Sequence, residues 1–307
     1  MSASCFPRSP RTPAAHPAAR RLCRATRSRW LRLVRNIRSD LYTGFAESGA
    51  RLGVVAGVTL VILGFWLLTV RAWGLDIKGF TLGDALSACL GGIPVFDPER
   101  DLRFRFPATW MLMLLAITYV TLSYPYHDLM GFGTHVLVSC GSRWVWWFAK
   151  CAWVVLASLA CCLIVGLVCT GFCAVVGLRF DLTLTSDAAR TLYMWIDPGT
   201  SLALGAFAAS APCMVVALVL VQLAASLVLR PVLSFGTTAA VLLASAYCFS
   251  PLLPGNYLMA ARTEGVIATG TSPLVGTLFA LVLAVAGVML GGVRFSHMDC
   301  MDKEFSA

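Results

Sequence analysis

Six stretches of the chain contain no Asp, Glu, Lys, Arg or His, and each is long enough to cross a lipid bilayer. A transmembrane helix needs about 20 mostly apolar residues to cross about 30 Å of hydrocarbon. The six stretches are Leu52–Val70, Phe106–Tyr126, Cys151–Leu178, Pro198–Leu229, Pro231–Ala261 and Gly265–Val293. Only 13% of the 307 residues are charged, against about 25% in a soluble domain. We therefore expect an all-α integral membrane protein with six transmembrane helices.

The last four stretches are longer than one crossing, so each must include a loop, a tilted helix or a re-entrant piece. The fifth helix is expected to end near Ser250, because Pro251, Pro254 and Gly255 follow it. A helical hairpin within Pro198–Leu229 would give seven spans. Its 32 residues are too few for two full crossings, so six spans is the preferred count.

The distribution of positive charge predicts the orientation. Cytoplasmic segments of membrane proteins carry an excess of Lys and Arg, and placing both termini in the cytoplasm puts 16 of the 24 cations there. We expect a disordered basic N-terminus over 1–25, an interfacial amphipathic helix over 26–50, the six-helix transmembrane domain over 51–293 and a cytoplasmic tail over 294–307. The basic N-terminus also has two alternative functions, as an organellar transit peptide or as a contact with anionic lipid.

The sequence contains none of the common catalytic motifs. No P-loop, H-E-x-x-H or G-x-S-x-G pattern occurs, so we expect no catalytic residues, no metal site, no cofactor and no enzyme activity. The spans also have no ionisable group at their centres, which argues against an ion-driven transporter. Gln222 is the strongest polar group deep in a span. It has two interpretations, a hydrogen bond between helices or a contribution to a translocation path.

The cytoplasmic segment between the second and third spans carries the most information. Pro125 is expected to end the second helix, and Asp128 to cap a short new helix that has Leu129 and Phe132 on one face. Such a helix transmits force from a cytoplasmic partner; the alternative is a solvated loop. An interfacial aromatic belt with a snorkelling lysine is expected next: Trp144, Trp146, Trp147, Phe148 and Lys150.

Three segments resemble the permeases of type 2 ABC exporters. A tryptophan-started helix leads to Tyr-Pro-Tyr-His-Asp-Leu-Met-Gly-Phe-Gly over 124–133, similar to the family's Y-P-x-x-D-L-x-G-x-G. Residues 142–153 resemble S-R-x-x-W-W-x-x-K-C-x-W, and residues 250–262 resemble S-P-x-x-x-G-N-Y-x-M-x-x-R. The three segments occur in the order that the family has, over residues 108 to 300.

The resemblance implies a multi-pass permease in the plasma membrane, coupled to a separate P-loop ATPase and paired with a second permease as a homo- or heterodimer. It implies no nucleic acid partner. The ATPase-coupling loop over 126–143 would use Tyr126, Asp128, Leu129, Gly131, Phe132, Gly133, Ser142 and Arg143. An outer re-entrant segment before the last span would contain Gly255, Asn256, Tyr257 and Arg262. The competing hypothesis is a non-transporting anchor or assembly protein that uses the 71–105 loop as its interaction surface.

Overall fold

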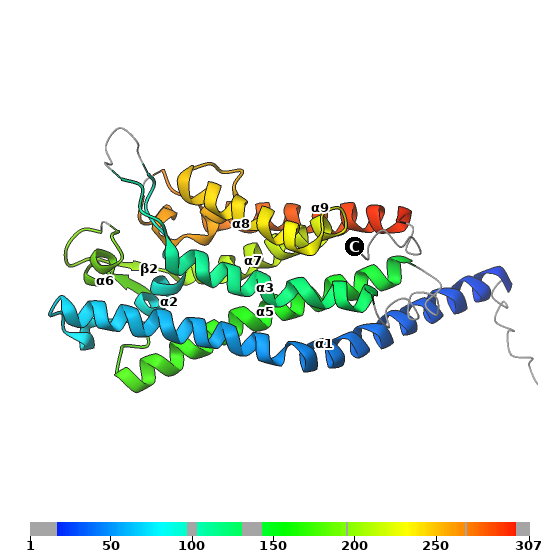
Figure 1. Ribbon diagram of the computed structural model, residues 1–307, viewed down its shortest axis with the longest axis horizontal. Coiled ribbons are helices and arrows are strands. Elements are labelled where there is room, and N and C mark those ends of the chain that lie inside the picture. Colours follow the sequence, from blue (N-terminus) through cyan, green and yellow to red (C-terminus); the bar gives the residue numbers. More distant parts are fainter. Residues whose placement is uncertain (1–16, 97–102, 131–142, 195, 268, 299–307) are drawn as a thin grey trace, which may run out of the picture.

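The computed structural model describes residues 17–96, 103–130, 143–194, 196–267 and 269–298. Six long helices form its body: α1 (Pro17–Ala72), α3 (Ala108–Met130), α5 (Arg143–Val176), α7 (Gly205–Ser226), α8 (Pro231–Tyr247) and α9 (Pro273–His297). They run alternately up and down, so the N-terminal part of α1 and the end of α9 lie at the same end of the bundle (Figure 1). We call this the terminal end and the opposite one the loop end.

Helix α7 lies at the centre of the bundle. It packs most extensively against α9 and also contacts α3, α5 and α8, while α1 packs mainly on α5 and α3. Of the four described helices that are long and apolar enough to cross a membrane, α7 is the most buried. Its sequence is apolar on every side, as expected for a helix surrounded by other helices.

Four helices in the described part of the chain are long and apolar enough to cross a membrane: Leu41–Ala72, Arg143–Val176, Gly205–Ser226 and Pro273–His297. Two more apolar helices are shorter: Ala108–Leu122, which is the first part of α3, and Pro231–Tyr247, which is α8. The outer faces of the long helices are also apolar; Leu163 and Leu167 of α5 are 63% and 61% exposed. Such continuous apolar surface fits lipid and not water. The prediction of an all-α membrane protein is confirmed at this level, whereas six crossings remain a prediction.

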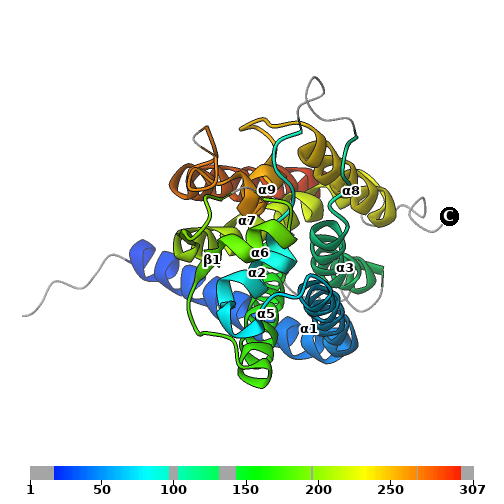
Figure 2. The ribbon, with the colours of Figure 1, turned by 90° about the vertical axis from the view of Figure 1, so that its left-hand side faces the viewer.

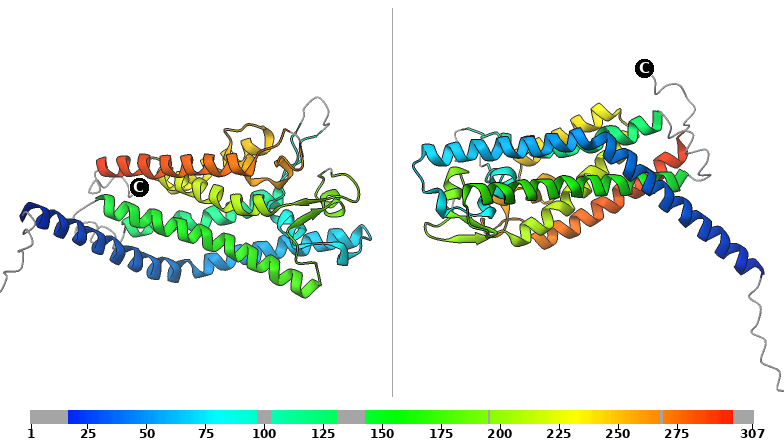
Figure 3. Two further views of the ribbon diagram at one scale, coloured as in Figure 1. Left: turned by 180° about the vertical axis from the view of Figure 1, so that it is seen from behind. Right: turned by 90° about the horizontal axis from the view of Figure 1, so that it is seen from below.

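The N-terminal part differs from the sequence prediction. A single helix, α1, runs from Pro17 to Ala72. Residues 17–25 are therefore helical rather than disordered, and the predicted interfacial segment over 26–50 is continuous with the predicted span from 51. Its first half leaves the bundle at an angle (Figure 3). Helix initiation is the costly step, so a stable spanning segment extends readily into the preceding residues, which are rich in the helix formers Ala and Arg. Residues 1–16 lie outside the described part.

The fourth apolar stretch forms one helix, so the alternative of a hairpin with seven spans is wrong. Helix α7 begins only at Gly205 and continues through Pro212 to Ser226. The fifth helix, α8, ends at Tyr247, close to the predicted end at Ser250.

Short elements form a cap over the loop end. They are the 3₁₀ helices η1 (Ile77–Gly79), η2 (Pro254–Leu258) and η3 (Ala260–Arg262), the helices α2 (Leu82–Leu90) and α6 (Ser186–Thr191), and the strands β1 (Thr183–Thr185) and β2 (Ser201–Ala203). The strands pair antiparallel, with Leu184 opposite Leu202. Viewed from this end, α2, α6 and β1 lie in front of α5 and α7 (Figure 2). Within the 71–105 segment, α2 is therefore folded onto the bundle, where it contacts α1, α3 and α5.

Candidate functional site

Arg262, predicted in the re-entrant segment, is completely buried at the loop end. Its guanidinium group donates to the carbonyl of Ala246 at 2.6 Å and to that of Ile93 at 3.1 Å, and it also contacts Asn256 Oδ1. Burial lowers the pKa of Arg262 to about 10, so the group stays charged at neutral pH. The positive charge therefore lies at the C-terminus of α8, where the helix dipole favours it.

The other predicted re-entrant residues lie in η2, and one of them, Asn256, binds the same arginine. Asn256 donates to the carbonyls of Cys248 and Ser250 at 3.2 and 2.8 Å, which closes the loop that follows α8. A Cβ atom added to Gly255 would lie 2.5 Å from the Cβ of Ser245, so only glycine fits there. Tyr257 donates its hydroxyl hydrogen to the carbonyl of Pro251 at 3.0 Å. The four residues thus form one connected unit, which we call the Arg262 cluster.

Asp84, which is not among the site residues predicted from the sequence, joins two segments of the cap. It forms a capping box with Thr81 at the start of α2. It also accepts hydrogen bonds from the backbone N–H of Thr185 at 2.7 Å and from its hydroxyl at 3.0 Å. The spacing Thr-x-x-Asp predicts this capping box, but no pattern in the sequence predicts the contact with Thr185, 101 residues away. Burial raises the pKa of Asp84 to about 6, although these hydrogen bonds lower it.

The raised pKa predicts that stability depends on pH. A carboxyl group with a pKa near 6 when folded and 3.8 when unfolded stabilises the fold fully below pH 3.8, and this contribution is lost as the pH rises through 6. Its full size is about 3 kcal/mol at about 1.4 kcal/mol per pH unit. We expect Asp84→Asn to remove this dependence between pH 4 and 6, measured as the free energy of unfolding in detergent. Asp187→Asn, at an exposed acid of α6, is the control and should preserve it.

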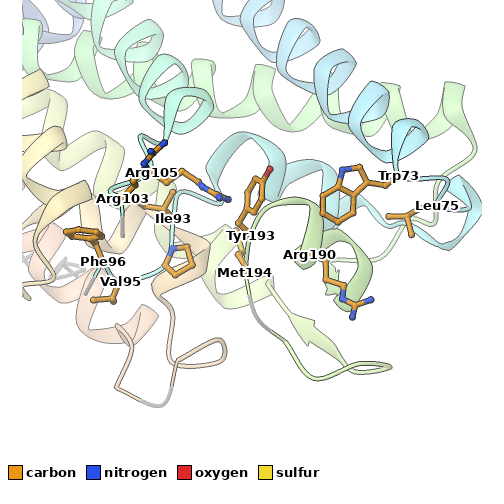
Figure 4. A pocket seen from close by; sticks show the side chains of 11 residues that line it. Trp73, Leu75, Ile93, Val95, Phe96, Arg103, Arg105, Arg190, Tyr193 and Met194 are labelled. Atoms are coloured by element: carbon orange, nitrogen blue, oxygen red, sulfur yellow. The ribbon is translucent and has the colours of Figure 1, made fainter. Parts of the chain in front are cut away.

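A cavity of about 690 Å³ opens within the cap (Figure 4). Its lining residues are Trp73, Leu75, Ile93, Pro94, Val95, Phe96, Arg103, Arg105, Arg190, Tyr193 and Met194. The guanidinium of Arg105 lies over the ring of Tyr193, 3.5 Å from its centroid. No acidic side chain lines the cavity within the described ranges. An apolar floor with a cationic rim suits an amphipathic anion.

Gln222 lies in the interior, with 3% of its surface exposed. Its side-chain Nε2 donates to the carbonyl of Thr118 on α3 at 3.3 Å, and its backbone carbonyl accepts from the Ser234 hydroxyl of α8 at 2.7 Å. The predicted hydrogen bond between helices is confirmed. Gln222 lines neither the 690 Å³ cavity in the cap nor a smaller cavity of about 260 Å³ inside the bundle.

The predicted coupling loop lies only partly in the described chain. Gly131, Phe132, Gly133 and Ser142 lie outside it, as do the side chains of Tyr126, Asp128 and Leu129. The backbone of α3 is helical through to Met130. The predicted break at Pro125 and the predicted helix start at Asp128 are therefore wrong, whereas residues 131–142, which would form the rest of the short helix, lie outside the described part. A proline inside a membrane helix is tolerated when other groups satisfy the freed carbonyl.

Arg143 and the tryptophans after it contact α9 rather than the surface. Arg143 donates to the carbonyls of Ser296 and Met298 at 2.8 and 2.6 Å. Trp146 and Trp147 are 3% and 1% exposed. Lys150 is 1% exposed, so the predicted interfacial belt with a snorkelling lysine is wrong for these three residues. Gly291 and Gly292 of α9 leave room for the rings of Trp147 and Trp144. These contacts join distant parts of the chain, so no pattern in the local sequence predicts them.

Comparison of the chain with family models, with curated proteins and with solved structures finds no match.

Proposed function

We propose that this chain is the permease subunit of an ATP-driven exporter in the plasma membrane, coupled to a separate P-loop ATPase. The observation that carries the proposal is the contact between segments of the resemblance. Trp110, near the start of the second predicted span, donates from its indole nitrogen to the carbonyl of Leu258 at 2.8 Å. Its ring also lies against the position of Gly255. A hydrogen bond thus joins two segments of the resemblance that are about 150 residues apart in the sequence.

The second segment of the resemblance has a matching role at the terminal end. Arg143 binds the end of α9, and the indole nitrogen of Trp147 donates to the carbonyl of Val288 at 2.8 Å. The motif residues therefore connect helices at both ends of the bundle. These contacts support the view that the motif residues belong together, as the resemblance to type 2 exporters implies.

The lack of an energy source in the sequence supports an external ATPase. The chain has no phosphate-binding P-loop, and the centres of its predicted spans carry no ionisable group through which an ion gradient could act. A transporter of this composition requires another subunit to supply free energy. A second permease, identical or different, would complete the translocation path, as in the family that it resembles.

A specific observation also favours the alternative of an anchor or assembly protein. The 690 Å³ cavity is built mainly from the 71–105 segment, which that hypothesis makes the interaction surface. The two functions differ in one measurable property. An exporter permease isolated from its own membrane retains an ATPase subunit and ATP hydrolysis, and an anchor retains neither.

A further inference from the structure

A second cavity, of about 260 Å³, lies inside the bundle between α2, α3, α5 and α7. Its lining is almost entirely carbon. Ser87 of α2 lines it together with Cys162 and Gly166 of α5 and with Ala208 and Pro212 of α7. Its volume is slightly below the usual range of small-molecule sites, about 300–1,000 Å³. An apolar molecule smaller than a typical drug would fill it.

Ser87 gives this cavity one unsatisfied hydroxyl group. The side chain is 2% exposed, and its Oγ has no hydrogen-bond partner in the described chain. Ser48 of α1 is likewise buried without a partner for its hydroxyl, but most other buried hydroxyls in the described chain are bonded. Thr59 donates to the carbonyl of Val55 at 2.7 Å, and Ser158 to that of Val154 at 2.9 Å. A buried polar group without a partner costs about 1–3 kcal/mol, and Ser87, unlike Ser48, lines this cavity, where a bound molecule can supply the missing partner.

Pro212 leaves a hydrogen-bond acceptor on the wall that α7 contributes to this cavity. Helix α7 continues through Pro212, but proline has no N–H group. The carbonyl of Ala208, four residues earlier, therefore lacks its helical donor. Ala208 lines the same cavity as Ser87, so the cavity combines a free hydroxyl with a carbonyl that can accept.

The wall formed by α5 and α7 provides space and access. A Cβ atom added to Gly166 meets nothing within 4 Å. Cys162, Gly166, Ala208 and Pro212 are all partly exposed, so the cavity opens sideways between these helices. Their neighbouring outer surface is apolar, with Leu163 63% exposed. A ligand would therefore enter from the hydrocarbon layer.

We propose that this cavity binds a small apolar alcohol from the membrane. A hydroxyl group accepts a hydrogen bond from Ser87 and donates one to the carbonyl of Ala208, whereas an alkane satisfies neither group. The hydrocarbon part fills the space beside Gly166. The site does not depend on the transport proposal, because it concerns only the described walls of this chain.

Photolabelling of the reconstituted full-length chain tests the proposal. The probe is an octan-1-ol analogue that carries an aliphatic diazirine, and labelled peptides are identified by mass spectrometry. We expect saturable labelling of peptides from α2, α5 and α7, competed by octan-1-ol and not by octane. Equal competition by octane would overturn the proposal, because the cavity would then bind any alkyl chain. The absence of saturable labelling would also overturn it, because the cavity would then bind no alcohol.

Two substitutions separate binding from folding. Ser87→Ala removes the hydroxyl and should weaken competition by octan-1-ol about three- to tenfold, the effect of one hydrogen bond. Gly166→Leu fills the cavity and should abolish saturable labelling. Gly171→Leu is its control on the same helix, since a Cβ there also meets nothing within 4 Å and Gly171 does not line the cavity. Unchanged competition with Ser87→Ala would contradict the proposed hydrogen bond.

Discussion

Replacing Arg262 by methionine is expected to lower the free energy of unfolding by about 3–5 kcal/mol. Methionine keeps an unbranched apolar side chain but removes every donor to the carbonyls of Ala246 and Ile93 and to Asn256. Removing one member of a buried charged network typically costs this amount, because the remaining polar groups are left without partners. Unfolding of the purified chain in mixed micelles of increasing denaturing detergent measures the change.

Arg179→Met is the matched control for this prediction. Arg179 lies in the same cap, but its side chain is exposed, so we expect a change of less than about 0.5 kcal/mol. Arg262→Lys retains the charge with fewer donors and should fall between the two. Equal stability of Arg262→Met and Arg179→Met would show that the Arg262 cluster does not hold the loop end together.

A leucine at Gly291 is expected to destabilise the contact between α5 and α9 by about 2–3 kcal/mol. A Cβ atom at Gly291 would lie 2.3 Å from the indole ring of Trp147 and 3.1 Å from the Cβ of Ala224. Trp147 cannot turn away freely, because its nitrogen is bonded to the carbonyl of Val288. Overpacking a close contact costs about 1–3 kcal/mol, and a leucine adds three more carbon atoms than alanine.

Gly64→Leu is the control for steric size, because a Cβ atom at Gly64 of α1 meets nothing within 4 Å. The detergent unfolding assay should report a small change for this variant. Trp147→Phe has a smaller ring and should recover part of the stability lost in Gly291→Leu. If Gly64→Leu and Gly291→Leu unfold alike, the destabilisation does not come from the contact with Trp147.

The sequence predicted the long apolar helices correctly because charge-free stretches are local signals. The end of α8 was also predictable, since the prolines and glycine that follow it break helices. Local signals failed at Pro125, where the helix continues to Met130. The expected loss of one hydrogen bond did not end the helix, because the surroundings of a membrane helix can satisfy the freed group.

Contacts between distant residues were not predictable from composition or periodicity. Arg262 donates to the carbonyl of Ile93, 169 residues earlier. The resemblance to type 2 exporters drew attention to Arg262, but it gave no partner for it. Neither a family motif nor an apolar pattern marked Asp84 or Ser87. The role of Asp84 depends on its contact with Thr185, and that of Ser87 on a cavity formed by four helices.

ATP hydrolysis that co-purifies with the tagged chain from its native membrane tests the proposed function most directly. The proposal predicts that the wild-type chain retains a P-loop ATPase subunit. Phe132→Ala, in the predicted coupling loop, should insert equally well and retain at least tenfold less, as expected for an apolar anchor of an interface. Thr134→Ala is the control within the same loop and should retain the wild-type amount. Absence of any ATPase with the wild-type chain, or full retention by Phe132→Ala, would contradict an exporter permease coupled through this loop.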